Sequence, residues 1–157
     1  MQDQLLIRPR GWFSRFLDIL AGDRRVATLE LSFLLDQGRA EIGGQGYELQ
    51  HPSFFARNYT MRRDGAVVAT ARADGFFFPT YRFQFDGQSY ELRRQGFWTS
   101  KMLVLRRAES EVLGSLYPDG LLSRRATAEL PAELPLALRV FVIWLTFVAW
   151  RQRRRRS

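Results

Sequence analysis

The stretch Val140-Phe-Val-Ile-Trp-Leu-Thr-Phe-Val-Ala-Trp150 decides the fold of this 157-residue chain. All of its residues except Thr146 are apolar, and it continues directly into the basic tail Arg151-Gln-Arg-Arg-Arg-Arg-Ser157. A helix that is apolar on all sides must be enclosed on all sides, either by lipid or by protein. The segment therefore either crosses a membrane or lies inside the β-rich chain that precedes it.

The length of the stretch favours enclosure by the chain. A membrane-spanning helix needs about 20 apolar residues. This stretch extends further only if the charge of Arg139 is accepted, and Pro131 and Pro135 stop it beyond that point. Because Trp144 and Trp150 suit a bilayer interface, a C-terminally anchored single-pass protein remains an alternative. In the enclosed helix, we expect Thr146 to bond back to its own helix and Arg139 to reach the barrel mouth.

The preceding region, residues 26–128, has the pattern of short strands joined by tight turns. Apolar and polar residues alternate over 27–33 and again over 80–85, which is the period of a half-buried strand. Turn signals occur as Asp-Gly pairs, at residues 64–65, 74–75, 86–87 and 119–120. We therefore predict a mainly β fold, a closed antiparallel β-barrel wrapped around the hydrophobic C-terminal α-helix.

An internal repeat supports a meander of strands. Tyr47-Glu48-Leu49, four further residues and Phe54-Phe55 recur 43 residues later as Tyr90-Glu91-Leu92, four residues and Phe97-Trp98. We interpret the two copies as strand–turn–strand units that pair into one sheet system.

The N-terminal segment has apolar residues at helical spacing. One predicted helix face carries Trp12, Phe13, Phe16, Leu17 and Leu20. We therefore divide the chain into an N-terminal segment, 1–25, with a short amphipathic helix, a barrel, 26–150, that includes a buried helix over 135–150, and a basic tail, 151–157. The first helix would either cover one barrel end or dip into a membrane interface.

The composition argues against several kinds of chemistry. The chain has no cysteine, which rules out a disulfide framework and a thiolate metal site. Its one histidine, His51, cannot build a zinc site of ordinary ligand count, and no nucleophile elbow accompanies it. The carboxylates are scattered over turns and strand edges, so no acid–base pair stands out. We expect a protein that is not an enzyme and has no metal or cofactor.

The charge points to an anionic partner. The net charge is +8, and the basic tail supplies five of the arginines. Near an anionic membrane each basic residue contributes about 1 kcal/mol. The candidate lipid-binding residues are Arg151, Arg153, Arg154, Arg155, Arg156, Trp12, Phe16 and Arg15. No nucleic-acid partner is expected, because no helix-turn-helix, zinc knuckle or RNP-type motif accompanies the charge.

The meander of short strands, the two repeat units and the last, wholly hydrophobic helix together resemble the tubby-like superfamily, which includes the LURP-one-related proteins and the phospholipid scramblases. The residues that carry the resemblance are Phe54–Ala69, Tyr81–Leu92, Val112–Tyr117 and Leu121–Trp150. The resemblance implies a barrel around a central helix, often associated with membranes or phosphoinositides. The acidic calcium-binding segment of scramblase-like proteins has no counterpart, since only Glu129 and Glu133 lie near the last helix, so no calcium site is expected.

These observations together favour a binding function. We predict a non-enzymatic binding module that associates peripherally with anionic phospholipid membrane surfaces. The alternatives are a protein-interaction or structural module with a solvated Arg tail, and the C-terminally anchored protein named above. The first residues lack the basic and apolar regions of a secretory signal, so a cytoplasmic location is expected, with the inner face of the membrane as the place of association.

Overall fold

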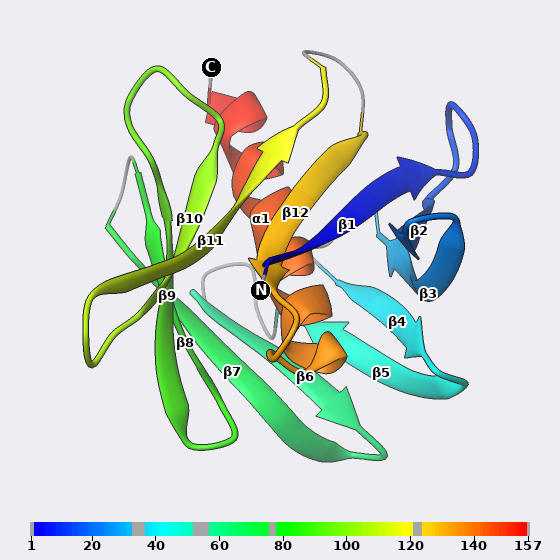
Figure 1. Ribbon diagram of the computed structural model, residues 1–157, viewed down its shortest axis with the longest axis horizontal. Coiled ribbons are helices and arrows are strands. Elements are labelled where there is room, and N and C mark those ends of the chain that lie inside the picture. The colour runs from blue at the N-terminus through cyan, green and yellow to red at the C-terminus, as the bar shows by residue number, and fades with distance from the viewer. Residues whose placement is uncertain (1, 33–36, 52–56, 76–77, 121–123, 157) are drawn as a thin grey trace.

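The computed structural model describes residues 2–32, 37–51, 57–75, 78–120 and 124–156. These residues form twelve strands and the helix α1 (Leu136–Arg156). The strands are β1 (Gln2–Pro9), β2 (Phe16–Ala21), β3 (Arg24–Leu31), β4 (Gly38–Ile42), β5 (Gln45–Gln50), β6 (Asn58–Arg63), β7 (Ala66–Asp74), β8 (Thr80–Phe85), β9 (Gln88–Arg94), β10 (Met102–Arg106), β11 (Glu111–Pro118) and β12 (Ala126–Pro131). Each strand pairs antiparallel with its sequence neighbours, and β12 closes the barrel against β1 (Figure 1). The predicted mainly β, closed antiparallel barrel is confirmed.

The apolar stretch of α1 lies in the core of the barrel. Every side chain from Val140 to Leu145 is at most 1 % exposed. Alternate strand residues such as Leu29 and Phe83 are buried with it, as the period of two requires. Thr146 donates from its hydroxyl to the carbonyl oxygen of Val142 at 2.9 Å, which satisfies this buried polar group within its own helix as expected.

The helix begins at one barrel mouth and leaves through the other. Near its start, Arg139 donates to the carboxylate of Asp3 on β1 at 2.9 Å. At the other end α1 continues beyond the predicted 135–150 and includes the basic residues up to Arg156. In the described part of the chain, no helix has the length and apolar content that crossing a membrane requires.

The prediction of a short N-terminal helix is wrong. Residues 16–21 form β2, which pairs with β1 and β3. Leu17 and Ile19 are fully buried, whereas their neighbours Phe16, Asp18 and Leu20 are half-buried on the other side of the strand. This alternation has the period of a strand. The pairing of β1 with β12 and β2 closes the barrel, and so tertiary pairing overrides the helical spacing.

The internal repeat has three copies, one more than the sequence pattern indicated. The hairpins β2–β3, β6–β7 and β10–β11 lie four strands apart, and each contains a β-bulge with one extra residue on its second strand. The extra residues are Val26, Val68 and Leu113. The barrel therefore consists of three four-strand units, β1–β4, β5–β8 and β9–β12.

The two barrel ends differ in their connections. At the end where α1 begins, called the turn end here, β2, β4, β6 and β8 are each followed by a two-residue turn. Asp64-Gly65 and Asp86-Gly87 form two of these turns with positive φ at every residue, as predicted. Asp74-Gly75 and Asp119-Gly120 instead begin longer connections at the opposite end, where α1 leaves the barrel. That opposite end is called the exit end (upper side of Figure 1).

Candidate functional site

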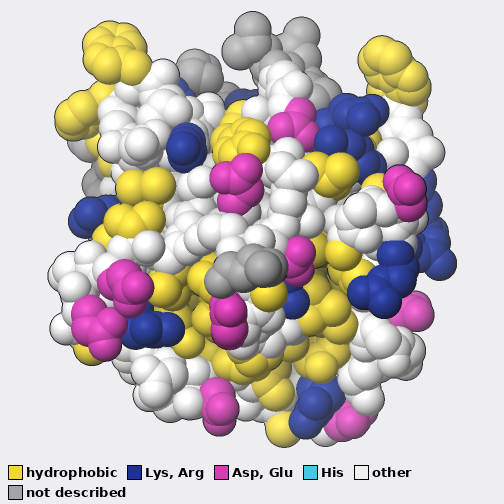
Figure 2. Space-filling view, in the orientation of Figure 1, with side chains coloured by type: hydrophobic (Ala, Val, Ile, Leu, Met, Phe, Trp, Pro, Cys, Tyr) yellow, Lys and Arg dark blue, Asp and Glu magenta, His cyan; other side chains and the backbone are white. Residues whose placement is uncertain are grey.

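The exit end carries exposed aromatic side chains on separate connections. Between β1 and β2, Trp12 and Phe13 are 95 % and 94 % exposed, and between β9 and β10, Phe97 and Trp98 are 69 % and 99 % exposed. Figure 2 shows apolar side chains projecting at both upper corners of the molecule, above these two connections. In the described part of the chain, the other exposed large hydrophobic residues are Phe78, also at this end, and two valines near the turn end. The exposed aromatic residues of the described part of the chain are therefore gathered at one end of the barrel.

The aromatic pairs recur with the three structural units. Trp12-Phe13 follows β1, and Phe97-Trp98 follows β9, which are the first strands of their units. In the sequence, each pair begins the same number of residues after the last inward-facing residue of its strand, which is Ile7 in β1 and Leu92 in β9. Phe54-Phe55 has the same position after β5 in sequence, and these two residues lie outside the described part of the structure.

The other exit-end connections are also apolar in sequence. They contain Phe33-Leu34-Leu35, Phe76-Phe77-Phe78 and Leu121-Leu122, of which the structure describes only Phe78. The two-residue turns of the opposite end consist of Gly22-Asp23, Gly43-Gly44, Asp64-Gly65 and Asp86-Gly87. All six connections at the exit end therefore carry large apolar residues, and none of these four turns does.

The basic tail is the last part of α1 and lies over the exit end. Arg151 donates from Nη1 to the carbonyl oxygen of Ser32, after β3, at 2.6 Å. Arg153 donates to the hydroxyl of Ser100, between β9 and β10, at 3.0 Å. Arg154 is exposed, and Arg155 and Arg156 belong to the helix, although their side chains lie outside the described part. The helical tail thus holds guanidinium groups above the barrel mouth.

Two further arginines join the tail at this end. Arg94 lies over the ring of Phe78, 4.2 Å from its centroid, and its pKa is lowered by burial and then by repulsion from Arg153. Burial likewise lowers the pKa of Arg124, with Arg154 as the second cause. Both arginines carry a positive charge, because the guanidinium group is not deprotonated in proteins. The mutual repulsion of these cations favours the approach of an anion.

Aromatic contacts fix the β9–β10 connection against the helix. Trp150 donates from Nε1 to the carbonyl oxygen of Ser100 at 2.7 Å. The rings of Phe78 and Phe97 pack edge to face with their centroids 5.0 Å apart. The corner that bears Trp98 is therefore supported by α1 and by the neighbouring connection.

Of the other predicted candidates, Arg15 ends the β1–β2 connection at the exit end, and Phe16 is the first residue of β2. Phe16 is half-buried, with the guanidinium carbons of Arg10 and Arg15 at 5.2 Å and 5.7 Å from its ring centroid. Arg15 also pairs with Glu30 at 3.3 Å. The structure therefore brings Trp12 together with the described tail arginines at the exit end, and places Arg15 and Phe16 where β2 begins at that end.

Sequence reasoning missed Phe97, Trp98, Arg94 and Arg124 as members of this end. The signal for the first two was present, because Trp12-Phe13 precedes Phe54-Phe55 by 42 residues and is the first copy of the repeated aromatic pair. The two arginines belong to recurring Arg-Arg pairs, 93–94 and 124–125, for which an anion-binding surface is one interpretation of the sequence, but only the closed barrel brings them beside the end of α1.

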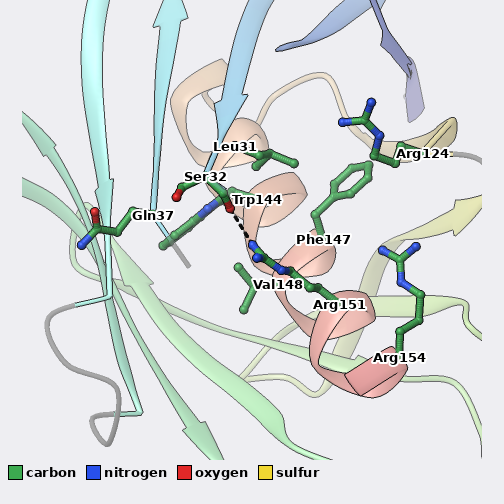
Figure 3. Close-up of a pocket in the computed structure, with 9 residues that line it drawn as sticks. All are labelled: Leu31, Ser32, Gln37, Arg124, Trp144, Phe147, Val148, Arg151 and Arg154. Carbon is green, nitrogen blue, oxygen red and sulfur yellow. Dashed lines mark hydrogen bonds between the residues drawn. The ribbon is translucent and has the colours of Figure 1, made fainter. Parts of the chain in front are cut away.

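A cavity of about 250 Å³ lies at the exit end between α1 and the barrel wall (Figure 3). Its lining residues are Leu31, Ser32, Gln37, Arg124, Trp144, Phe147, Val148, Arg151 and Arg154. The helix contributes five of them at spacings that place them along one helix face. A larger, shallow depression of about 590 Å³ on the outer wall has acidic and basic groups mixed along it. Among the described residues, no group of His, Asp and Glu is arranged to hold a metal ion.

Comparison with known proteins gives no match: neither a protein-family model, nor a curated protein, nor a solved structure matches the chain. The resemblance to the tubby-like superfamily remains a prediction from the sequence pattern, and function has to be argued from the exit end itself.

Proposed function

We propose that this chain is a non-enzymatic module that docks peripherally on anionic phospholipid membranes with its exit end facing the lipid. The observation that carries the proposal is the pair of aromatic tips, Trp12-Phe13 and Phe97-Trp98, which flank the arginine-bearing end of α1. Tryptophan is favoured at the level of the lipid head groups, where its ring is partly in the apolar region and its N–H is hydrated.

The expected energies are large enough to hold a protein on a membrane reversibly. An aromatic residue buries about 150–250 Å² when enclosed. Half of that area at about 25 cal/mol per Å² gives about 2 kcal/mol for each tip residue. Each arginine near an anionic surface adds about 1 kcal/mol, and salt screens this part only. Docking should therefore have a salt-sensitive and a salt-resistant component.

The arrangement of the tips favours a bilayer over a protein surface. The two described tips are on different connections, on opposite sides of α1 in Figure 1, so they do not form one continuous patch. A fluid bilayer adapts to separated tips, whereas a protein partner would need two matching pockets. Anionic lipids are concentrated in the cytoplasmic leaflet, and we propose that leaflet as the docking surface.

Co-sedimentation with vesicles tests the proposal. The purified chain is mixed with vesicles of phosphatidylcholine, with or without phosphatidylserine, at low and high salt. We expect binding to the anionic vesicles that weakens with salt. The Trp12→Ser/Trp98→Ser variant should bind less at both salt concentrations, by up to about a thousandfold, because it loses about 4 kcal/mol of apolar contact that salt does not screen. The triple change of Arg154, Arg155 and Arg156 to Gln should weaken binding by about a hundredfold at low salt only.

Matched variants at the turn end serve as controls. Val67→Ser/Val112→Ser removes two exposed apolar residues, and a triple change of Arg24, Arg63 and Arg107 to Gln removes three exposed charges. Both controls should sediment like the unchanged chain, apart from the small effect of net charge. Equal losses in exit-end and turn-end variants would refute docking through the exit end. Failure of the unchanged chain to bind anionic vesicles would overturn the proposal and favour a protein partner.

A further inference from the structure

The exit-end cavity has an apolar wall and a cationic side. Phe147 and Val148 of α1 provide apolar surface together with the half-buried Leu31 of β3, and the fully buried Trp144 lies behind them. Further along the same helix face, Arg151 and Arg154 follow, and Arg124 lies opposite, toward which Phe147 projects in Figure 3. From Trp144 to Arg154 the helix rises about 15 Å. The change from apolar to cationic along this distance matches the two parts of an amphiphile.

In the described part of the chain, two donors of the cavity lining are buried without a hydrogen-bond partner: Trp144 Nε1 and Nη1 of the charged Arg124. The Nη2 of Arg124 donates to the carbonyl oxygens of Gly11 and Trp12, at 3.2 Å and 3.3 Å. Among the residues that the structure describes, its buried Nη1 has no hydrogen-bond partner. A buried donor without a partner is costly, and a charged acceptor that reached it would make a charge-assisted bond. Repulsion between Arg124 and Arg154 adds to the demand for an anion at this position.

We propose that this cavity binds one chain of an anionic amphiphile, with the alkyl or acyl chain against Leu31, Phe147 and Val148 and a phosphate or carboxylate head at Arg124 and Arg154. A small-molecule site is expected to be mostly apolar with a few placed polar groups, and this lining has that character. The phosphate or carboxylate head is the shared chemistry, whether the ligand comes from a bilayer or is free in solution.

This inference rests on the proposed membrane docking in one respect only: the docked membrane would be the source of the ligand. The cavity is at the end that would face the bilayer, so a lipid chain could enter without crossing bulk water. Because binding of a monomeric amphiphile needs no vesicle, a failure of this site and a failure of docking are separable results.

Isothermal titration calorimetry without vesicles tests the site. The full chain is titrated with decyl phosphate and decanoate, each below its aggregation concentration, and with the neutral monodecanoylglycerol and inorganic phosphate. We expect saturable one-to-one binding of at least one anionic amphiphile, weaker binding of the neutral one and no measurable binding of phosphate alone. In a series of alkyl phosphates, affinity should rise about fourfold per methylene and then level off when the cavity is full.

Three variants locate the site. Arg124→Gln should lower the affinity for the anionic amphiphile by tenfold or more and leave that of the neutral amphiphile unchanged. Val148→Phe should fill the apolar part and weaken both ligands. Arg63→Gln, an equal charge change at the turn end, should bind like the unchanged chain. Circular dichroism checks the fold of each variant, and Arg154→Gln replaces Arg124→Gln if the latter does not fold.

Several results would overturn the proposal. One is no binding of either anionic amphiphile. Another is equal loss in Arg124→Gln and Arg63→Gln, which would indicate a general charge effect. A third is an affinity that rises with chain length without levelling off, which would indicate adsorption to the exposed aromatic tips instead of entry into a finite cavity.

Discussion

Replacing Gly114 by alanine should destabilise the barrel strongly. Gly114 on β11 faces the backbone of β12, and a Cβ added there would lie 2.0 Å from the carbonyl oxygen of Glu129. It would also lie 3.1 Å from Leu130 Cδ2. Since Cβ contacts below 3.0 Å are essentially never observed, β11 and β12 would have to separate by about 1 Å locally.

The cost follows from this separation. Backbone hydrogen bonds of about 2.9 Å would lengthen to about 3.9 Å, which breaks them. Loss of two such bonds costs about 2 kcal/mol, and overpacking adds 1 kcal/mol or more, for a total of about 3 kcal/mol. For a chain of this size each kcal/mol lowers the melting temperature by about 2–4 °C, so we expect a decrease of about 6–12 °C.

The threefold repeat by itself suggests that alanine is acceptable at position 114, which is the opposite of the prediction from the geometry. Ala27 and Ala69 occupy the positions of the other two units that correspond to Gly114, next to the bulge residue. A consensus of the three units would therefore recommend alanine at position 114. The geometry forbids it only in the third unit, where the carbonyl oxygen of Glu129 lies in the way.

Thermal and urea unfolding monitored by circular dichroism provide the measurement. Gly46→Ala is the control, because a Cβ at Gly46 meets no atom within 4 Å and the residue has no positive φ. It should be neutral or stabilise by up to about 1 kcal/mol. Gly38→Ala should fall between the two, since its Cβ would lie 2.6 Å from the carbonyl oxygen of Glu30. If all three variants unfold alike, the close approach of β11 and β12 is wrong.

Two further predictions concern α1. Val142 is 1 % exposed, so Val142→Asp would bury an unpaired charge, cost several kcal/mol and prevent folding. The control Val67→Asp, at an exposed position, should be tolerated. Expression level and circular dichroism distinguish the two variants, and a folded Val142→Asp protein would contradict the buried helix. Trp150→Phe removes the 2.7 Å bond to the Ser100 carbonyl and should cost about 1 kcal/mol while making the β9–β10 connection more sensitive to proteolysis. Unchanged cleavage in Trp150→Phe would show that this bond does not hold the connection.

The sequence was sufficient for the fold class because the length of the strongest pattern favoured one of its two physical solutions. An eleven-residue apolar stretch too short to cross a membrane needs a surrounding wall, and alternating strands supply it. The helix prediction for the N-terminal segment was wrong because the local pattern fits two structures. Leu17 and Ile19 alternate as in a strand, and one helix face fits Trp12, Phe13, Phe16, Leu17 and Leu20 equally well. Such a short stretch is ambiguous until its pairing partners are known. Here the partners are β1 and β3.

The candidate site could be predicted only in part, for a different reason. The sequence pattern identified the tail arginines by their charge and Trp12 as a candidate aromatic contact. Arg124 was not singled out in this way, since its significance comes from contacts with residues more than 110 positions away, and from an orphaned Nη1 that no sequence pattern shows. Local patterns identify which side chains repeat, whereas the cavity depends on where the closed barrel brings them.

The threefold repeat also constrains how the exit end would meet a surface. The aromatic pairs follow β1, β5 and β9, so the strands that carry them are four positions apart in a ring of twelve. Three attachment points divided evenly around a ring define a plane perpendicular to the barrel axis. A surface that engaged the two described pairs, after β1 and β9, would lie across the exit mouth, and would face the end of α1 and the cavity beside it. A single aromatic tip would allow the barrel to tilt, whereas in the proposed docking the tips on both sides of α1 would hold the arginines against the same membrane surface.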